Sequence, residues 1–206
     1  MKIVIVDYGV GNLMSIISAI EKIGYKCEIT DNEIKIKNAD RIILPGVGAF
    51  KKGMENLRKK NLIEVLNYCY KERKVPILGV CLGFQLMAKK SFEFGVCEGL
   101  GWLNAEVKRF PVDKNFPTPH MGWNKIKIKS QDSIFKKFDA EEIFFFANSY
   151  YVQTEENSLI TSTCKYGIEF TSSVRKKNLV GVQFHPEKSQ ISGLLVYKNF
   201  IEKYAS

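Results

Sequence analysis

The residues around Cys81 have the types and spacing that a nucleophilic catalyst requires. Cys81 stands in the run Gly79-Val80-Cys81-Leu82-Gly83, between an apolar stretch typical of a buried strand and the start of a predicted helix. A thiol in such a strand–turn–helix elbow needs small neighbours on both sides, and the positive end of the helix favours its ionised form. The backbone N–H of Leu82 is expected to donate to an oxyanion. The pattern therefore predicts a cysteine nucleophile.

A thiol nucleophile needs a base, and the chain has only two histidines, His120 and His185. His185 follows the last apolar run, so a parallel sheet would bring it to the carboxyl edge where Cys81 must also lie. Glu187 is placed to hold the imidazole, and Pro186 disfavours helix at His185. The order nucleophile, base, acid differs from that of hydrolases with this elbow, in which the acid precedes the histidine. In isolation, His-Pro-Glu also fits a capped helix start, and His120 is interpreted as structural or interfacial.

Alternating strands and helices are expected to position these side chains. Strands are predicted at residues 2–7, 27–30, 41–44 and 75–80, and helices at 13–23, 51–72 and 82–90. Continuous apolar strands that alternate with amphipathic helices indicate βαβ units, a parallel sheet and helices on both of its faces. We therefore expect an α/β fold with a flavodoxin-like open parallel sheet.

The second half of the chain has a different pattern. Between Glu106 and Ser173 the apolar runs are shorter and rich in β-branched and aromatic residues, as at 125–128 and 143–146, which favours a small antiparallel extension of the sheet. A last strand is predicted at 179–184 and an amphipathic helix around 191–204. No linker or repeat interrupts the sequence, so a single domain over residues 1–206 is expected.

Composition argues against several other classes of protein. The 206 residues are 45% hydrophobic, enough for a folded core, and carry a net charge of +9. The lysines are spread along the chain without one basic block, which favours a solvated surface over a nucleic-acid site. Apolar runs are far shorter than the ~20 residues of a membrane-spanning helix. No signal peptide is recognisable, so no membrane association and a cytoplasmic location are expected.

Neither a metal nor a cofactor is expected. The five cysteines are an odd number with no CxxC pair, which argues against zinc and against a disulfide framework. Gly9-Val10-Gly11 lies between a strand and a helix, but Met14 replaces the third glycine of a dinucleotide fingerprint. We interpret this segment as a tight turn near a ligand or partner. The cysteines outside the elbow are interpreted as buried structural thiols: Cys27, Cys69, Cys97 and Cys164.

Several segments together resemble the class I (triad) glutamine amidotransferases, and more narrowly the glutaminase subunits of imidazole glycerol phosphate synthases. They cover nearly the whole chain, at residues 7–13, 45–50, 79–85, 99–101, 119–124 and 181–189. The resemblance implies that Cys81 attacks the side-chain amide of glutamine, releases ammonia and leaves a glutamyl thioester that water hydrolyses. His185 would transfer the protons, and Glu187 would fix its tautomer.

The same resemblance assigns further residues. Residues 45–48 correspond to the family's oxyanion strand, where a backbone N–H near Val47 would be a second oxyanion donor beside that of Leu82. The glycines of this strand would allow a peptide flip. The substrate glutamine would be held by four further residues: Gly48, Gln85, Ser149 and Tyr150.

The resemblance also implies a partner and leaves two alternatives open. The partner would be a (β/α)8 cyclase subunit, HisF, which forms a heterodimer with the glutaminase and uses its ammonia to make imidazole glycerol phosphate and AICAR in histidine biosynthesis. Asn148, where the subfamily usually has histidine, and Trp102-Leu103-Asn104 permit as a first alternative a paralogous glutaminase that feeds another synthase, such as a surface-sugar amidotransferase. The second alternative is a non-enzymatic flavodoxin-like protein with an elbow cysteine, which would need neither His185 nor Glu187.

Overall fold

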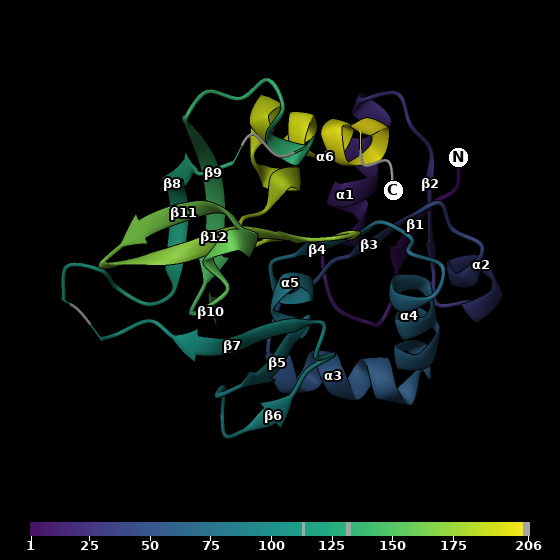
Figure 1. Ribbon diagram of the computed structural model, residues 1–206, viewed down its shortest axis with the longest axis horizontal. Coiled ribbons are helices and arrows are strands. Elements are labelled where there is room, and N and C mark those ends of the chain that lie inside the picture. The colour runs from purple at the N-terminus through teal and green to yellow at the C-terminus, as the bar shows by residue number, and fades with distance from the viewer. Residues whose placement is uncertain (113, 131–132, 204–206) are drawn as a thin grey trace.

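The computed structural model describes residues 1–112, 114–130 and 133–203, and within them five parallel strands form the centre of the fold. These strands are β1 (Ile3–Val6), β2 (Cys27–Thr30), β3 (Arg41–Leu44), β4 (Ile77–Val80) and β13 (Leu179–Val182). They lie side by side in the order β2-β1-β3-β4-β13 (Figure 1). β1, β4 and β13 are buried along their whole length, as expected for a sheet covered on both faces. The predicted α/β fold with a flavodoxin-like parallel sheet is confirmed.

Helices cover both faces of these strands. The α-helices of the described residues are α1 (Leu13–Lys22), α2 (Glu33–Lys37), α3 (Phe50–Lys59), α4 (Leu62–Lys71), α5 (Leu82–Leu86) and α6 (Gln190–Lys203). Figure 1 shows α1 and α6 above the parallel strands and α3, α4 and α5 below them. Ile20 and Tyr197 belong to the apolar core on the first face, and Leu66 and Phe84 to the core on the second.

Two predicted helices are shorter in the structure. Residues 51–72 form two helices, because Asn61 adopts a left-handed backbone conformation with φ of 55° and interrupts the turn between α3 and α4. The helix predicted to reach residue 90 ends at Leu86, and the chain continues as the strand β5 (Ala88–Ser91). The sequence does not predict α2, whose five residues are too short for a periodic pattern. The last predicted helix corresponds to α6, and residue 204 lies outside the described residues.

Beyond β13 the sheet continues as an antiparallel half, in the order β13-β12-β11-β8-β9. These strands are β12 (Ile168–Lys176), β11 (Ile160–Tyr166), β8 (His120–Ile128) and β9 (Glu141–Asn148). Along β9, Phe144 and Phe146 are buried, whereas Ile143 between Glu142 and Phe144 is half exposed, the alternation of a strand with one covered face. The predicted antiparallel extension is therefore present.

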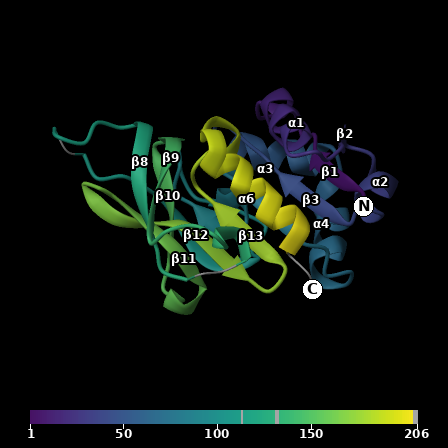
Figure 2. The ribbon, with the colours of Figure 1, turned by 90° about the horizontal axis from the view of Figure 1, so that it is seen from above.

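The antiparallel half curls until its last strand meets the segment that follows β13. The amide of His185 donates to the carbonyl oxygen of Phe145 at 2.8 Å. The rings of Phe144 and Phe184 stack with their centroids 4.0 Å apart. Seen from above, β8, β9 and β10 lie at one end of the molecule and β1, β2 and α2 at the other (Figure 2). The curl brings the edge of the sheet to the carboxyl end of β13.

A second sheet, which the sequence does not predict, packs beside the first. In the described residues it has four strands in the order β10-β7-β5-β6. Its strands are β5, β6 (Cys97–Glu98), β7 (Leu103–Arg109) and β10 (Tyr150–Thr154). β5 holds two lysines among four residues and β6 is two residues long, so neither has the alternating pattern that identifies a strand. Within the described ranges, no helix is long and apolar enough to cross a membrane.

Candidate active site

Cys81 lies in a sharp turn between β4 and α5. Its backbone has φ of 52° and ψ of −107°, a conformation that is costly for any residue with a side chain. A Cβ added to Gly83 would lie 1.8 Å from the carbonyl oxygen of Leu44, and one added to Gly79 would lie 2.7 Å from the end of Met87. Only glycine fits on both sides of the cysteine, which is the physical reason for the Gly-x-Cys-x-Gly spacing.

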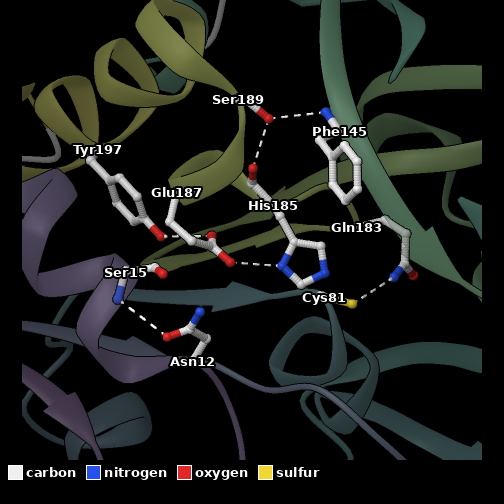
Figure 3. A network of polar contacts seen from close by, with 9 residues as sticks. All are labelled: Asn12, Ser15, Cys81, Phe145, Gln183, His185, Glu187, Ser189 and Tyr197. Carbon is white, nitrogen blue, oxygen red and sulfur yellow. Dashed lines mark hydrogen bonds and ion pairs between the residues drawn. The ribbon is translucent and has the colours of Figure 1, made fainter. Parts of the chain in front are cut away.

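The neighbouring strand brings His185 to this turn. β4 and β13 run parallel with Val80 opposite Val182, and the amide of Cys81 donates to the carbonyl oxygen of Val182 at 2.8 Å. The chain then leaves β13 and places His185 three residues further on, at the same edge of the sheet. Figure 3 shows the imidazole between Glu187 and the sulfur of Cys81. The expected convergence of Cys81 and His185 at one sheet edge is therefore present in the structure.

Glu187 holds one side of the imidazole. Its Oε1 lies 2.7 Å from Nδ1 of His185, and both side chains are at most 4% exposed. The hydroxyl of Tyr197, on α6, donates to the other carboxylate oxygen at 3.3 Å. Nε2 of His185 is buried and has no hydrogen-bond partner among the described residues. With Nδ1 bonded to the carboxylate, Nε2 is the nitrogen left to exchange a proton with the thiol.

The charges of the site act on the imidazole in opposite directions. Burial alone would lower the pKa of His185, because it penalises the charged form. The negative charge of an ionised Cys81, and then the hydrogen bond and charge of Glu187, outweigh burial and raise the pKa of His185 to about 10. The protonated imidazole is thus stabilised by its position between Cys81 and Glu187. This is the arrangement in which cysteine attacks a carbonyl carbon and histidine returns the proton to the leaving group.

The predicted oxyanion segment, residues 45–48, faces Cys81. One of the two predicted oxyanion donors, the amide of Leu82, already has a hydrogen-bond partner in this segment. The amide of Leu82 donates to the carbonyl oxygen of Gly46 at 3.3 Å. Tyr8, which is fully buried, donates its hydroxyl to the carbonyl oxygen of Pro45. Val47 is 42% exposed, and Gly48, with φ of 102°, has open space where a Cβ would be. While this contact holds, the amide of Leu82 is not free to donate to another group.

A chain of amide contacts joins the thiol to two of the predicted substrate-binding residues. Nε2 of Gln183 donates to the sulfur of Cys81 at 3.6 Å, and Oε1 of Gln183 accepts from Nε2 of Gln85 at 3.1 Å. Gln85 also donates to the carbonyl oxygen of Tyr150 at 2.9 Å. The side-chain amide of Asn148 donates to that same carbonyl at 2.9 Å. For Ser149 the structure gives a backbone contact, from the amide of Phe110 at 3.1 Å.

Several residues for which the sequence predicts no role contact this site. Gln183 directly follows β13 and lies two residues before His185, and this closeness to the predicted base is a signal that could have identified it. Tyr8 and Tyr197 come from distant parts of the chain, and no spacing in the sequence connects them with Cys81. The hydroxyl of Ser189 bonds to the backbones of His185 and Phe145.

His120 lies inside the antiparallel half of the sheet. Its ring is stacked against Tyr166 with the centroids 3.9 Å apart and against Phe146 at 4.7 Å. Nε2 is 3.2 Å from the side-chain amide of Asn124. Burial lowers the pKa of His120 to about 4, so the imidazole is neutral at physiological pH. These contacts make His120 part of the apolar core.

Within residues 1–112, 114–130 and 133–203, no group of three His, Cys, Asp or Glu side chains is arranged to hold a metal ion.

Comparisons with known proteins agree with this geometry. The family model of class-I glutamine amidotransferases matches residues 4–203. The chain is 45% identical over 200 residues to the imidazole glycerol phosphate synthase subunit HisH of Moorella thermoacetica, covering 97% of this chain and 94% of that one. It is 40% identical to subunit HisH 2 of Pseudomonas aeruginosa, covering 97% and 98%. A crystal structure of a glutamine amidotransferase superposes with a TM-score of 0.74 over 97% of both chains at 16% identity, which shows a shared fold.

Proposed function

Because the chain belongs to the class I glutamine amidotransferase family, we propose that it is the glutaminase subunit of an imidazole glycerol phosphate synthase, active in histidine biosynthesis. The observation that carries the proposal is the buried arrangement of Cys81, His185 and Glu187, with Glu187 2.7 Å from the imidazole. The extent of the similarity to HisH subunits supports the pathway. Residues 1–206 would act as one catalytic domain in the cytoplasm.

The proposed reaction uses these three side chains in two steps. The thiolate of Cys81 attacks the side-chain carbonyl carbon of glutamine, and the imidazolium of His185 gives its proton to the nitrogen that leaves as ammonia. A glutamyl thioester remains on the sulfur. Neutral His185 then takes a proton from water, which attacks the thioester and releases glutamate. Glu187 keeps Nδ1 protonated throughout, so that Nε2 faces the reacting atoms.

The tetrahedral intermediates of both steps need donors for their negative oxygen. We assign this role to the amides of Leu82 and Val47. The contact between Leu82 and the Gly46 carbonyl supports a resting state that must change before catalysis. The substrate would lie along the Gln85–Tyr150 network, with Gly48 allowing its backbone to come close.

Exposed apolar side chains beside the site support a protein partner. Met121 and Trp123 on β8 and Ile143 on β9 are 63%, 49% and 48% exposed, and with Phe145 they form what we call the outer β8–β9 face. Ile191, at the start of α6 near the His185 turn, is 81% exposed. Grouped exposed apolar residues mark interaction sites. We propose that a (β/α)8 cyclase subunit of the HisF type docks here as a heterodimer and receives ammonia without its loss to water.

Glutamine hydrolysis measured with and without the partner tests this proposal. The chain is expressed with the cyclase subunit from the same genome, and glutamate formation is followed for the isolated chain and for the purified complex. We expect slow hydrolysis alone and a large stimulation in the complex with its ligand. The Cys81→Ala variant should lose hydrolysis and still bind the partner. Unchanged hydrolysis in that variant would refute the proposed chemistry.

One observation favours a second candidate function. Asn148 replaces the histidine usual in the subfamily and bonds to the same Tyr150 carbonyl as Gln85, so it lies against the proposed substrate network. The numeral in the name HisH 2 of the Pseudomonas relative implies more than one such subunit in that organism. A paralogue that supplies ammonia to another synthase would fit both facts. Rescue of a histidine auxotroph supports the histidine pathway, whereas co-purification with a different synthase supports the paralogue.

A further inference from the structure

Three hydrogen bonds join the backbone of His185 to strand β9. The amide of His185 donates to the carbonyl oxygen of Phe145 at 2.8 Å. The amide of Phe145 donates to the hydroxyl oxygen of Ser189 at 3.0 Å. That hydroxyl donates in turn to the carbonyl oxygen of His185 at 2.7 Å. Figure 3 shows the two bonds of Ser189, with its hydroxyl above the histidine backbone and beside Phe145.

This pattern resembles an antiparallel pair of residues with a hydroxyl inserted into it. In a hydrogen-bonded antiparallel pair, the two residues exchange two direct N–H to C=O bonds. Here one of these bonds is direct, and the other passes through Ser189. The inserted oxygen holds the carbonyl of His185 away from the amide of Phe145. The separation between His185 and β9 is therefore set by a side chain.

The surrounding turn fixes Ser189 in place. η3 (Pro186–Lys188) ends with the amide of Ser189 donating to the carbonyl oxygen of Pro186 at 2.9 Å. Gly193 donates to the carbonyl oxygen of Ser189 at 3.0 Å, and a Cβ at Gly193 would lie 1.8 Å from the oxygen of Pro186. Ser189 itself is 1% exposed. A hydroxyl held by such close packing has one available position.

We propose that Ser189 is a positioning residue, whose hydroxyl fixes the backbone of His185 relative to strand β9 and so holds the imidazole against the Cys81 thiol. The inference rests on the proposed glutaminase function. Without the hydroxyl, the Phe145 amide either loses its partner or bonds directly to the His185 carbonyl, which still accepts from the amide of Lys188 at 3.0 Å. Direct bonding would draw His185 toward β9. Displacing a catalytic group by about 1 Å lowers rates by roughly 100-fold.

The same bonds connect His185 to the outer β8–β9 face. The Phe145 ring lies in an edge-to-face contact with Trp123, with centroids 5.9 Å apart. The ammonium of Lys188 lies 5.4 Å from the centre of the same ring. A partner that packs on Trp123 and Phe145 would thus contact Phe145, the residue whose backbone is hydrogen-bonded to His185. Partner docking on Phe145 would therefore be coupled to His185 through the two hydrogen bonds of Ser189.

Steady-state kinetics of the complex form the first test. The Ser189→Ala variant should lower kcat for glutamine hydrolysis by roughly 100-fold while KM changes less than about twofold, because the displaced group acts on the reacting atoms. The matched control is Ser162→Ala, another buried serine, whose hydroxyl makes two bonds at 2.6 Å to Ser172 and Ser173 on β12. The control should lose similar stability and keep kcat. Ser189→Thr, which retains a hydroxyl, should recover much of the lost rate.

The two histidines of the chain provide a second test. Imidazoles labelled with ¹³C give two signals in the full chain, from His185 and His120, and each can be titrated by NMR. Two groups act on the His185 ring: Cys81 from the elbow after β4, and Glu187 on η3. Glu187 is itself bonded to Tyr197 on α6. In Ser189→Ala, the pKa of His185 should move down toward the ordinary value as the ring leaves Cys81. The titration of His120 should stay unchanged and serves as an internal control.

The outcomes separate this inference from the proposed function. If the wild-type complex hydrolyses glutamine and Ser189→Ala matches Ser162→Ala in kcat and in the His185 titration, the positioning role is wrong and the glutaminase assignment stands. If the wild-type complex does not hydrolyse glutamine, the proposed function fails, and the NMR titration still decides whether Ser189 positions the ring. A lowered kcat with an altered His185 signal supports both.

Discussion

At the residue scale, the site depends on groups that are buried together and so control each other's charge. The pKa of His185 is raised because the interactions with Cys81 and Glu187 exceed the penalty of burial. Tyr197 is fully buried, and burial and then the charge of Glu187 raise its pKa well above the ordinary value, so it remains a hydrogen-bond donor. His185 and Tyr197 therefore both keep their protons at neutral pH.

The Glu187→Gln substitution tests this coupling. It removes the charge with little change in shape, and the amide can present an N–H to Nδ1, which favours the wrong tautomer of His185. We expect the pKa of His185 to fall and kcat for glutamine to drop by roughly 10²–10⁴-fold, with KM changed much less. Steady-state kinetics of the complex measure the effect. Tyr197→Phe, which removes only the second bond to the carboxylate, should lose far less, and equal losses would argue against the orienting role of Glu187.

At the scale of elements, the curled antiparallel half is both a core and a support for the site. Its inner face holds stacked rings, among them Phe144 on Phe184 and His120 between Phe146 and Tyr166. Its edge strand β9 holds the His185 backbone from the side opposite to Cys81. A substitution that loosens this core is therefore expected to displace His185, the proposed catalytic base.

Acid should destabilise this core through His120. In the unfolded chain its pKa is near 6.5, and in the folded protein burial lowers it to about 4. Above pH 6.5 the ring is neutral in both states. As the pH falls from 6.5 toward 4, the unfolded state takes up a proton that the folded state does not, so the free energy of unfolding decreases. His120→Phe keeps a stacking ring without a titratable group, and its unfolding free energy in urea should decrease less over this range. Parallel curves for the two proteins would contradict this account.

The parts of the fold and site that follow local rules could be predicted from the sequence. The glycines around Cys81 and the position of His185 after an apolar run locate the thiol and its base, because parallel strands end at one edge. The single helix expected at 51–72 is interrupted at Asn61, which has a left-handed backbone conformation. The periodic pattern of apolar residues continues across this position and so does not reveal the break. The Gly46–Leu82 contact and the Ser189 bridge depend on how distant segments meet after folding. No residue spacing in the sequence predicts those contacts.

At the scale of the whole molecule, the two ends of the large sheet have different surroundings. Figure 2 shows β8 and β9 at one end and β2 with α2 at the other. The outer β8–β9 face adjoins the site through Phe145 and His185, whereas α2 packs against α4 and contacts β1. Exposed apolar residues occur at both ends. Those at the β8–β9 end include Trp123, whose ring contacts Phe145, and the backbone of Phe145 is hydrogen-bonded to His185 and Ser189.

Trp123→Ala should therefore weaken binding of the proposed cyclase partner. A half-buried tryptophan at the centre of an interface commonly contributes about 2 kcal/mol, which corresponds to roughly a 30-fold weaker Kd. Titration calorimetry with the purified partner measures this change. The matched control is Ile34→Ala, which truncates a side chain that is 69% exposed on α2 and should leave Kd unchanged. Equal effects of the two substitutions would place the partner elsewhere.

The Gly46 carbonyl accepts from the Leu82 amide, which we propose as a donor to the oxygen of glutamine. Because this carbonyl belongs to the same chain, its effective concentration at the Leu82 amide is fixed. Adding glutamine does not lower that concentration. A chain newly released from the ribosome and still unassembled would accordingly consume the cell's glutamine only slowly. The rate of nitrogen release would then follow the number of completed assemblies and not the number of chains synthesised.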